Sequence, residues 1–186
     1  MIEKMVLVEE KSKCCGCGAC MKICPRNAIS MEEDEHGFIY PKIDESKCVN
    51  CGVCKKICSF QNSVETNKSQ KAYAFSLKDE KKIMNSASGG AFYALAESMI
   101  SQGGIVYGSS MQKENGIMTV KHKRAEKIEE LKQFQGSKYV QSDMTDAFIR
   151  IRNDLLQGKK VLFSGSPCQN AALKKFLSKE YNNLYT

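Results

Sequence analysis

Residues 14–25 read Cys-Cys-Gly-Cys-Gly-Ala-Cys-Met-Lys-Ile-Cys-Pro, and four of these cysteines follow the spacing C-x2-C-x2-C-x3-C: Cys14, Cys17, Cys20 and Cys24. The same spacing returns 34 residues later at Cys48, Cys51, Cys54 and Cys58. Neighbouring residues return with it, since Cys17-Gly18 matches Cys51-Gly52 and Lys22-Ile23-Cys24 matches Lys56-Ile57-Cys58. The first third of the chain is therefore an internal duplication.

This spacing has a chemical reason. Three cysteines separated by two residues each can wrap a loop around one face of a [4Fe-4S] cubane, while a fourth cysteine, three residues on, reaches the other cluster. We therefore assign one cluster to Cys14, Cys17, Cys20 and Cys58 (the first quartet), and the other to Cys48, Cys51, Cys54 and Cys24 (the second quartet). Gly16, Gly18 and Gly52 suit the positive φ and close backbone approach that such loops require.

Two other uses of the cysteines are conceivable, a disulfide framework and structural zinc sites. A disulfide framework needs an oxidising compartment, to which nothing in the sequence points. Structural zinc is chemically possible, but its ligands usually come as two separated C-x2-C pairs. Iron–sulfur ligation is favoured over both. Cys15 fits no ligand position, and we interpret it as a packed thiol rather than a ligand.

Length and composition set the broad class. The 186 residues are 42% hydrophobic and 26% charged, with a net charge of +7, which argues against global disorder and leaves room for one medium domain or two small ones. No apolar run is long enough for a membrane span, and the N-terminus does not read as a secretory signal, so we expect an intracellular, cytoplasmic protein. Residues 1–64 hold 9 Lys+Arg and 9 Asp+Glu, whereas residues 65–186 hold 19 and 12. Two parts of different chemistry are implied.

The second part alternates expected strands and helices. Residues 1–60 form the cysteine-rich domain, the polar stretch 61–71 is the linker, and 72–186 follow. Apolar periodicity predicts helices over 90–102, 125–134, 144–158 and 170–179, and strands over 72–76, 105–108, 117–121 and 160–164. This alternation is typical of an α/β domain.

Three segments of the second part have compositions that packing does not explain. Asn85 to Gly90 opens a helix and exposes amides that could hold a phosphate, although on local sequence a plain cap at Ser88 is favoured. The polar run 136–142 could bind a cofactor or be a simple loop. The third segment is 161–169, in which Cys168 follows a buried strand at a helix start, where a thiolate is stabilised, although a lone cysteine is more often an inert small hydrophobe.

The cysteine-rich residues resemble a known domain. Residues 10–60 look like a bacterial-type two-[4Fe-4S] ferredoxin domain, which also explains a hairpin over 28–43 between its two halves. One departure is visible, because the second run ends in Cys58-Ser59 where the pattern expects Cys-Pro. No ligand is lost by it.

The second part resembles the coenzyme F-420 (deazaflavin) hydrogenase/dehydrogenase β-subunit family. Four motifs in order carry the resemblance: Ser-Ala-Ser-Gly-Gly (86–90), Gly-Gly-Ile-Val-Tyr-Gly (103–108), Gly-Ser-Lys-Tyr-Val-Gln-Ser (136–142) and Val-Leu-Phe-Ser-Gly-Ser-Pro-Cys-Gln (161–169). The resemblance implies an iron–sulfur flavoprotein in which an FAD exchanges electrons with the clusters and with a redox partner protein or small-molecule acceptor. It also implies flavin-binding roles for Ser88, Gly89, Gly90, Ser137, Lys138 and Tyr139, and places Cys168 near the redox centre as the candidate catalytic residue.

Members of that family continue past the position of Thr186, so the expected fold is an α+β ferredoxin-like two-cluster domain followed by an incomplete α/β domain. A C-terminally truncated sheet is expected to bind FAD weakly or not at all. The predicted function is an oxidoreductase module that joins two clusters to a flavin or deazaflavin-type acceptor. The alternative is a ferredoxin-like carrier that docks a redox partner without its own catalysis. A nucleic-acid partner is disfavoured, because aromatic and basic residues do not interleave.

Overall fold

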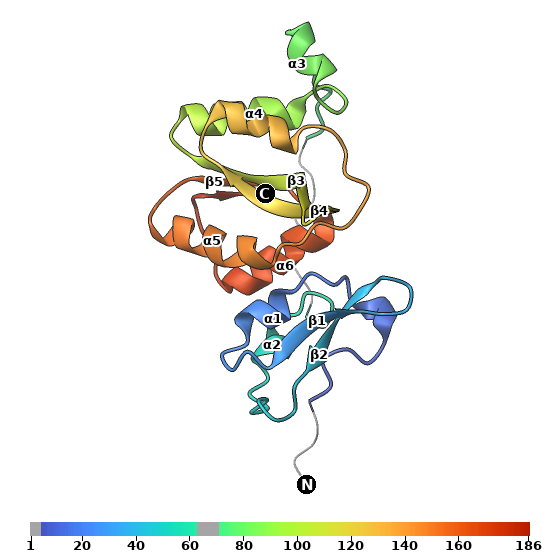
Figure 1. Cartoon of the computed structure of the whole chain (residues 1–186). Coiled ribbons are helices and arrows are strands. Elements are labelled where there is room, and N and C mark those ends of the chain that lie inside the picture. Colours follow the sequence, from blue (N-terminus) through green and yellow to red (C-terminus); the bar gives the residue numbers. More distant parts are fainter. Residues whose placement is uncertain (1–4, 63–70) are drawn as a thin grey trace. The chain divides into compact units, whose positions relative to one another are not determined.

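The computed structural model describes residues 5–62 and 71–186 (Figure 1). They form a mixed α/β structure with two small sheets. Most of the predicted linker, residues 63–70, lies outside the described residues. The chain divides into two compact units that do not follow the order of the sequence: unit 1 is 1–65, 144–149 and 166–180, and unit 2 is 66–143, 150–165 and 181–186.

The duplication is visible in unit 1. Helix α1 (Ala19–Ile23) and helix α2 (Val53–Lys56) begin 34 residues apart, each after a glycine in the left-handed region, Gly18 at φ +76° and Gly52 at φ +74°. A 3-10 turn, η1 (Lys11–Lys13), precedes the first of them. The equivalent glycines let each cysteine loop turn sharply into its helix, since a residue with a β-carbon disfavours that backbone conformation.

The predicted hairpin between the two halves is confirmed. Strands β1 (Ile29–Glu33) and β2 (Ile39–Ile43) pair antiparallel with Ile29 opposite Ile43. The carboxylate of Asp34 closes the turn by accepting from the amides of His36 and Phe38, both at 3.0 Å. The inner residues of the hairpin join Leu7 in a core that also contains Cys54.

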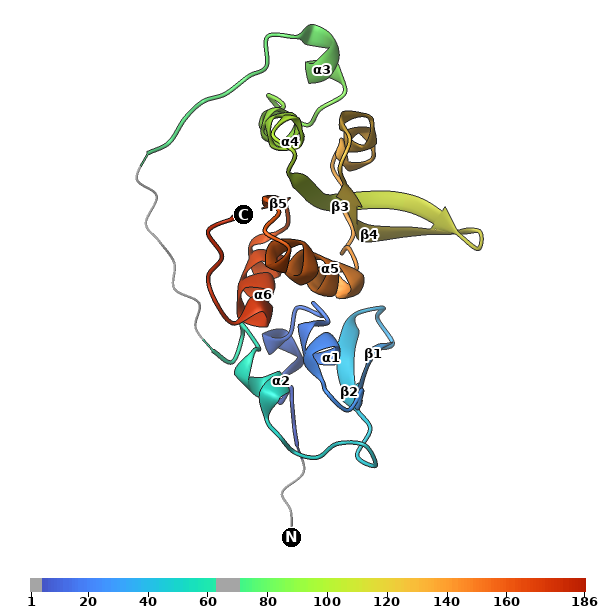
Figure 2. The same cartoon turned by 90° about the vertical axis from the view of Figure 1, so that its left-hand side faces the viewer.

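Unit 1 is completed by a helix from late in the chain. Helix α6 (Pro167–Leu177) packs against α1 in this unit (Figure 2). The first turns of α5 (Thr145–Leu156) belong here as well, and Phe148 lies against Phe176 of α6 with ring centroids 5.0 Å apart.

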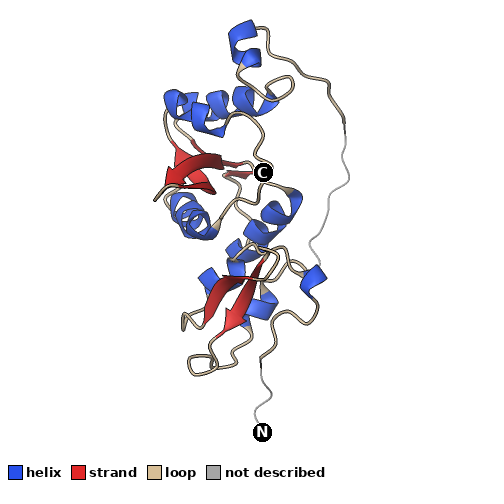
Figure 3. Ribbon diagram, turned by 45° about the vertical axis from the view of Figure 1, so that its right-hand side comes forward, coloured by secondary structure: helices blue, strands red, loops and turns tan. Residues whose placement is uncertain are grey.

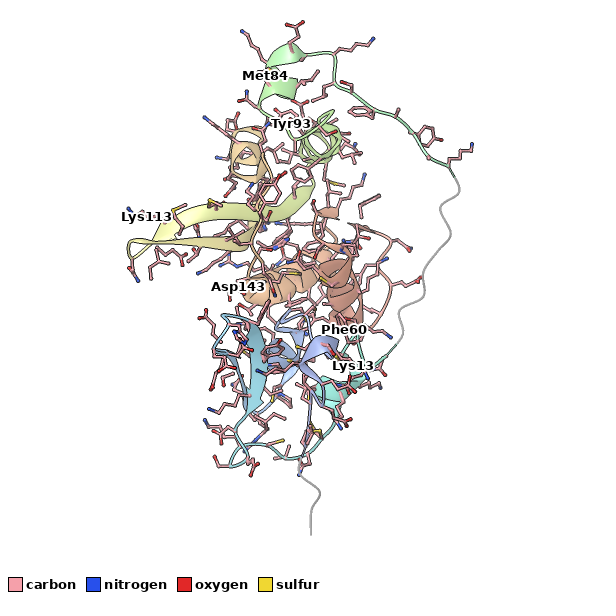
Figure 4. The ribbon with its side chains drawn as sticks, turned by 90° about the vertical axis from the view of Figure 1, so that its right-hand side faces the viewer. Lys13, Phe60, Met84, Tyr93, Lys113 and Asp143 are labelled. Atoms are coloured by element: carbon pink, nitrogen blue, oxygen red, sulfur yellow. The ribbon has the colours of Figure 1, made fainter. Side chains whose placement is uncertain are left out.

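Unit 2 is built on a four-stranded sheet in the order β4-β3-β5-β6. Strands β3 (Ile105–Glu114) and β4 (Ile117–Ala125) form an antiparallel hairpin, while β5 (Val161–Phe163) is parallel to β3 and to β6 (Leu184–Tyr185). Helix α4 (Ala91–Ser101) covers one face (Figure 1), with a core of Ala96, Ile100, Val106, Ala125, Leu131 and Phe134. Lys113 lies near the end of β3, close to the turn of the β3–β4 hairpin (Figure 4).

Two expectations for this unit are wrong. Residues 72–76 form no strand: they lead as loop to α3 (Glu80–Met84) (Figure 3). The side chains of Tyr73 and Phe75 are exposed. The backbone there bonds elsewhere, with the amide of Leu77 donating to Gly89 O at 2.9 Å. The short helix expected over 125–134 is a 3-10 helix, η2 (Ile128–Phe134), and it begins later than expected because β4 extends to Ala125. The other predicted helices and strands are confirmed, although β3 and β4 are longer than expected.

Among the described residues, no helix has the length and apolar character that crossing a membrane requires.

Candidate functional site

The first quartet surrounds one small cavity in unit 1. Cys14 and Cys17 come from the loop that leads into α1, and Cys20 lies in the first turn of α1. Cys58 comes from the residues after α2, so the two halves of the duplication meet here. Apolar side chains such as Leu7 and Ile57 complete the wall. The cysteines in the lining are Cys14, Cys15, Cys17, Cys20 and Cys58.

The second quartet surrounds another cavity in the same unit. Cys24 projects into it from the end of α1, beside the three cysteines of the α2 loop. Val53, Ile29 and Ile43 supply apolar wall. The cysteines in the lining are Cys24, Cys48, Cys51 and Cys54. Each cavity therefore holds three cysteines of one run and the last cysteine of the other, which is the crossed grouping expected from the spacing.

The donor set suits a cluster larger than a single ion. Within 5–62 and 71–186, no three Cys, His, Asp or Glu side chains are close enough to hold one metal ion. A cubane makes a different demand, because each of its four iron corners takes one thiolate and the thiolates need only face a shared space. Eight soft sulfur donors, four about each cavity, meet that demand.

Backbone amides donate to the sulfur atoms of predicted ligands in both quartets. The Gly16 amide donates to Cys14 Sγ at 3.4 Å, and the Ala28 amide donates to Cys24 Sγ at 3.3 Å. Such bonds stabilise negative charge on sulfur and are one of the means by which a protein sets a cluster's reduction potential.

Burial and a neighbouring thiol shift the pKa values of cysteines in the first quartet in opposite directions. Burial raises the pKa of Cys20 to about 12. A hydrogen bond from Cys15 lowers the pKa of Cys17, and this bond outweighs the effect of burial there. Cys15 therefore influences the pKa of a predicted ligand and also lies in the lining of the same cavity. Its influence was not foreseen, because the sequence shows only that it is adjacent to Cys14.

Unit 2 contains a polar cavity of about 350 Å³, and all three unusual segments of the second part contribute to it. Such a volume lies at the lower end of small-molecule sites. Aromatic rings from α4 and η2 form one part of the wall, with Tyr93 labelled in Figure 4, and small polar residues form the rest. The lining residues are Ser86, Ala87, Gly90, Phe92, Tyr93, Gly108, Ser109, Phe134, Gln135, Gly136, Ser137, Lys138 and Ser164.

The residues proposed from the resemblance divide between this cavity and its surroundings. Gly90, Ser137 and Lys138 line it, whereas Ser88, Gly89 and Tyr139 are not in the lining, and Tyr139 is 93% exposed. Cys168, which belongs to unit 1, is not in the lining either.

Two glycines at the start of α4 are required by the backbone. A β-carbon on Gly89 would lie 2.1 Å from Phe75 O, and one on Gly90 would lie 2.5 Å from Leu77 Cδ1. Gly90 also has φ +77° and caps α4, whose first turn carries no acidic residue. The positive end of this 11-residue helix thus opens beside the cavity wall.

Lys138 brings a cation to the polar cavity. Its Nζ donates to Gln135 O at 2.8 Å and to Gln133 O at 3.2 Å, and burial lowers the pKa of this ammonium. The two carbonyls hold the side chain in place. One further donor direction of an ammonium is then open to a ligand.

His122 is a residue that the sequence reasoning missed. Its side chain is buried and stacks on Phe163, and its Nε2 atom lies 3.0 Å from Ser164 O. A carbonyl can only accept, so Nε2 carries the proton, and Nδ1 accepts from Ser142 Oγ at 2.9 Å. Burial lowers the pKa of His122 and keeps the ring neutral. The ring thereby holds the Ser164 backbone at the cavity wall.

Cys168 lies in the first turn of α6. Ser166 caps this helix, its amide donating to Gln169 Oε1 at 3.0 Å, and Ser166 Oγ lies 3.1 Å from Cys168 Sγ.

Comparison with known proteins supports the nature of the N-terminal residues. Residues 13–62 match the family model of the 4Fe-4S dicluster domain. None of the curated proteins compared with the chain matches it. The match supports an iron–sulfur, ferredoxin-like domain and a role in electron transfer.

Proposed function

We propose that the chain is an oxidoreductase module in which two [4Fe-4S] clusters in unit 1 exchange electrons with a flavin held in the polar cavity of unit 2. The first quartet holds one cluster and the second quartet the other. Each cluster supplies single electrons, and a flavin can pair them for a two-electron acceptor of flavin or deazaflavin type.

The observation that carries the proposal is the convergence of separate motifs on one cavity. The segments 86–90, 108–109 and 136–138 are far apart in the sequence, yet each contributes residues to the lining of the same space, together with Ser164 after β5. Aromatic side chains of the wall suit the apolar face of an isoalloxazine ring. The N-terminus of α4 and Lys138 suit a phosphate, since exposed helix amides and an ammonium both bind anions.

Two measurements on anaerobically purified protein test the proposal. We expect about 8 iron per chain, the content of two cubanes, and weak but saturable binding of added FAD. Iron without any flavin binding would instead favour the ferredoxin-like carrier that docks a redox partner. Zinc in place of iron would refute both.

A charge reversal locates the flavin. Lys138→Glu places a carboxylate in the polar cavity, and we expect it to weaken FAD binding by about tenfold or more, because a charge-assisted bond to phosphate becomes a repulsion. Lys132→Glu is the matched control, since Lys132 is exposed on η2 and does not line the cavity. Iron content is unchanged in both variants. Equal FAD affinities in the two variants would remove the flavin from this cavity.

A further inference from the structure

The duplication allows the two cysteine cavities to be compared position by position, because residues 34 apart in the sequence are equivalent. The ligand cysteines of the two linings occupy equivalent positions, but the residue two places after the last cysteine of each run does not agree. Arg26 stands there in the first run and lines the second cavity. Its equivalent, Phe60, lines the first cavity. Two sites of like construction therefore differ by a charge.

The second cavity also has more of its lining in contact with solvent. Four of its described lining residues are exposed: Pro25, Arg26, Val49 and Cys51, the last of these a predicted ligand. Val49 is 59% exposed. In the described lining of the first cavity only Phe60 is exposed, and all four cysteines of the first quartet are partly buried.

Elements from late in the chain cover the first cavity within unit 1. Ala172 of α6 belongs to its lining and is only 1% exposed. Thr145, at the start of α5, approaches the same loop so closely that a β-carbon on Gly18 would lie 2.7 Å from its Cγ2 atom. The described lining of the second cavity comes from residues 5–54 alone. The fold has therefore enclosed one site of the duplicated pair and left the other accessible.

Charge and solvent act on a cluster in the same direction. Among the described residues that line the two cavities, Arg26 is the only one with a cationic side chain, and an arginine stays protonated at any working pH. A cluster gains one negative charge when it is reduced, so a nearby cation and contact with water both favour the reduced form. Both raise the reduction potential of a cluster in the second cavity relative to one in the first.

Hydrogen bonds to sulfur separate the two sites less. A backbone amide donates to a predicted ligand sulfur in each quartet, at 3.4 Å in the first and 3.3 Å in the second. The Cys15 thiol adds a bond to Cys17 in the first quartet, which acts in favour of that cluster. A thiol is a weak donor, however, and its effect is smaller than that of a full positive charge.

We propose that the second quartet holds the cluster of higher potential and is the site at which the chain exchanges electrons with an external one-electron carrier. The inference rests on the ligand sets of the proposed function. An electron from the carrier reduces the second cluster and leaves the carrier oxidised, and the next electron reduces the first cluster. No bond forms or breaks and no proton moves. The chain thus holds the two electrons that a flavin takes as a pair.

A mediated redox titration of the full chain, followed by electron paramagnetic resonance, measures both potentials. We expect two separate midpoints. Arg26→Phe gives the second site the residue of the first, and it should lower the higher midpoint and leave the lower one unchanged. Phe60→Arg makes the reciprocal exchange and should raise the lower midpoint. Two midpoints that stay unchanged in both variants would overturn the proposal, as would a downward shift of the lower midpoint in Arg26→Phe.

Two further variants keep the titration specific. Lys174→Phe is the matched control, because it removes an exposed cation of unit 1 that lines neither cavity, and both midpoints should stay where they are. Arg26→Gln removes the charge and keeps a polar side chain, so it replaces Arg26→Phe should that variant contain less iron. It is expected to lower the same midpoint.

Access from solvent is tested on the same samples with a neutral gadolinium chelate, which reaches clusters without regard to charge. We expect the chelate to speed the spin relaxation of the signal with the higher midpoint more than that of the other. A stronger effect on the signal with the lower midpoint, or equal effects on both, would overturn the assignment of the accessible site. The titration needs no flavin, so failure of FAD to bind leaves its result standing. An iron content well below about 8 per chain would instead refute the ligand sets.

Discussion

Replacing Cys24 by alanine separates crossed from uncrossed ligation. Cys24 lies in the first cysteine run but lines the cavity of the second, beside Cys48, Cys51 and Cys54. The variant therefore leaves three thiolates around the second cavity and all four around the first. Each cubane holds four iron atoms, so iron content is expected to fall from about 8 to about 4 per chain.

Alkylation of the native variant shows which cluster is lost. Thiolates bound to iron are protected from N-ethylmaleimide, whereas the thiols of an empty site react. We expect Cys48, Cys51 and Cys54 to become reactive in Cys24→Ala, while the first quartet stays protected. Cys58→Ala is the matched control, because Cys58 is the equivalent residue of the second run and lines the first cavity. It is expected to give the same iron content with the opposite reactivity pattern.

Uncrossed ligation gives a distinct result. If each run held its own cluster, Cys24→Ala would expose Cys14, Cys17 and Cys20, and the reasoning from both the spacing and the cavities would be refuted. Loss of nearly all iron from both variants would show instead that the two clusters assemble only together. The ligands would then be assigned by oxidising the iron-loaded variants slowly and following which cysteines become reactive first. The quartet that lacks a ligand is expected to react first.

Further predictions concern unit 2. Tyr107 is fully buried and donates to Asp154 Oδ2 at 2.6 Å, so Tyr107→Phe costs about 1.5–3 kcal/mol of stability, the usual contribution of a hydrogen bond to a charged group. Amides of β3 that exchange through opening of this unit should then exchange about 10- to 100-fold faster in hydrogen-exchange mass spectrometry, and equal rates would contradict the argument. Gly89→Ala is expected to release the segment around Leu77, because the added carbon cannot fit 2.1 Å from Phe75 O. Faster exchange at Leu77 with an unchanged rate in β5 would be the evidence, and protection of Leu77 as in the unsubstituted chain would argue against it.

The quartets could be predicted from the sequence because ligation imposes a local spacing. A run of C-x2-C-x2-C-x3-C has few uses, and the duplication supplies the partner for each fourth cysteine. The packing of α6 against α1 could not be predicted in this way. No spacing in the sequence records a contact between elements so far apart in the chain.

Only part of the polar cavity could be predicted from the sequence, because some of its residues come from segments with no unusual composition. Gly90, Ser137 and Lys138 stand out by composition, whereas His122 and Ser109 lie in a hairpin that reads as two ordinary strands. The alternation Ala-Tyr-Ala-Phe at 72–75 is typical of a strand, yet the amide of Leu77 bonds to Gly89. Local propensity was overridden there by a tertiary contact.

The net charge of +7 is distributed unevenly between the two units. Helix α6 brings Lys174, Lys175 and Lys179 into unit 1, which then carries 12 Lys+Arg and 12 Asp+Glu, while unit 2 carries 16 and 9. Two oxidised cubanes with four thiolates each add about −2 apiece, so unit 1 becomes acidic by about −4 and grows more negative with each electron. Unit 2 keeps the whole surplus of +7. A basic unit favours phosphate-bearing ligands and acidic partners, and a negative cluster unit favours basic ones. Salt should therefore weaken the docking of either kind of partner. Added inorganic phosphate should compete with an acidic redox protein for unit 2, and it should not compete with a basic one.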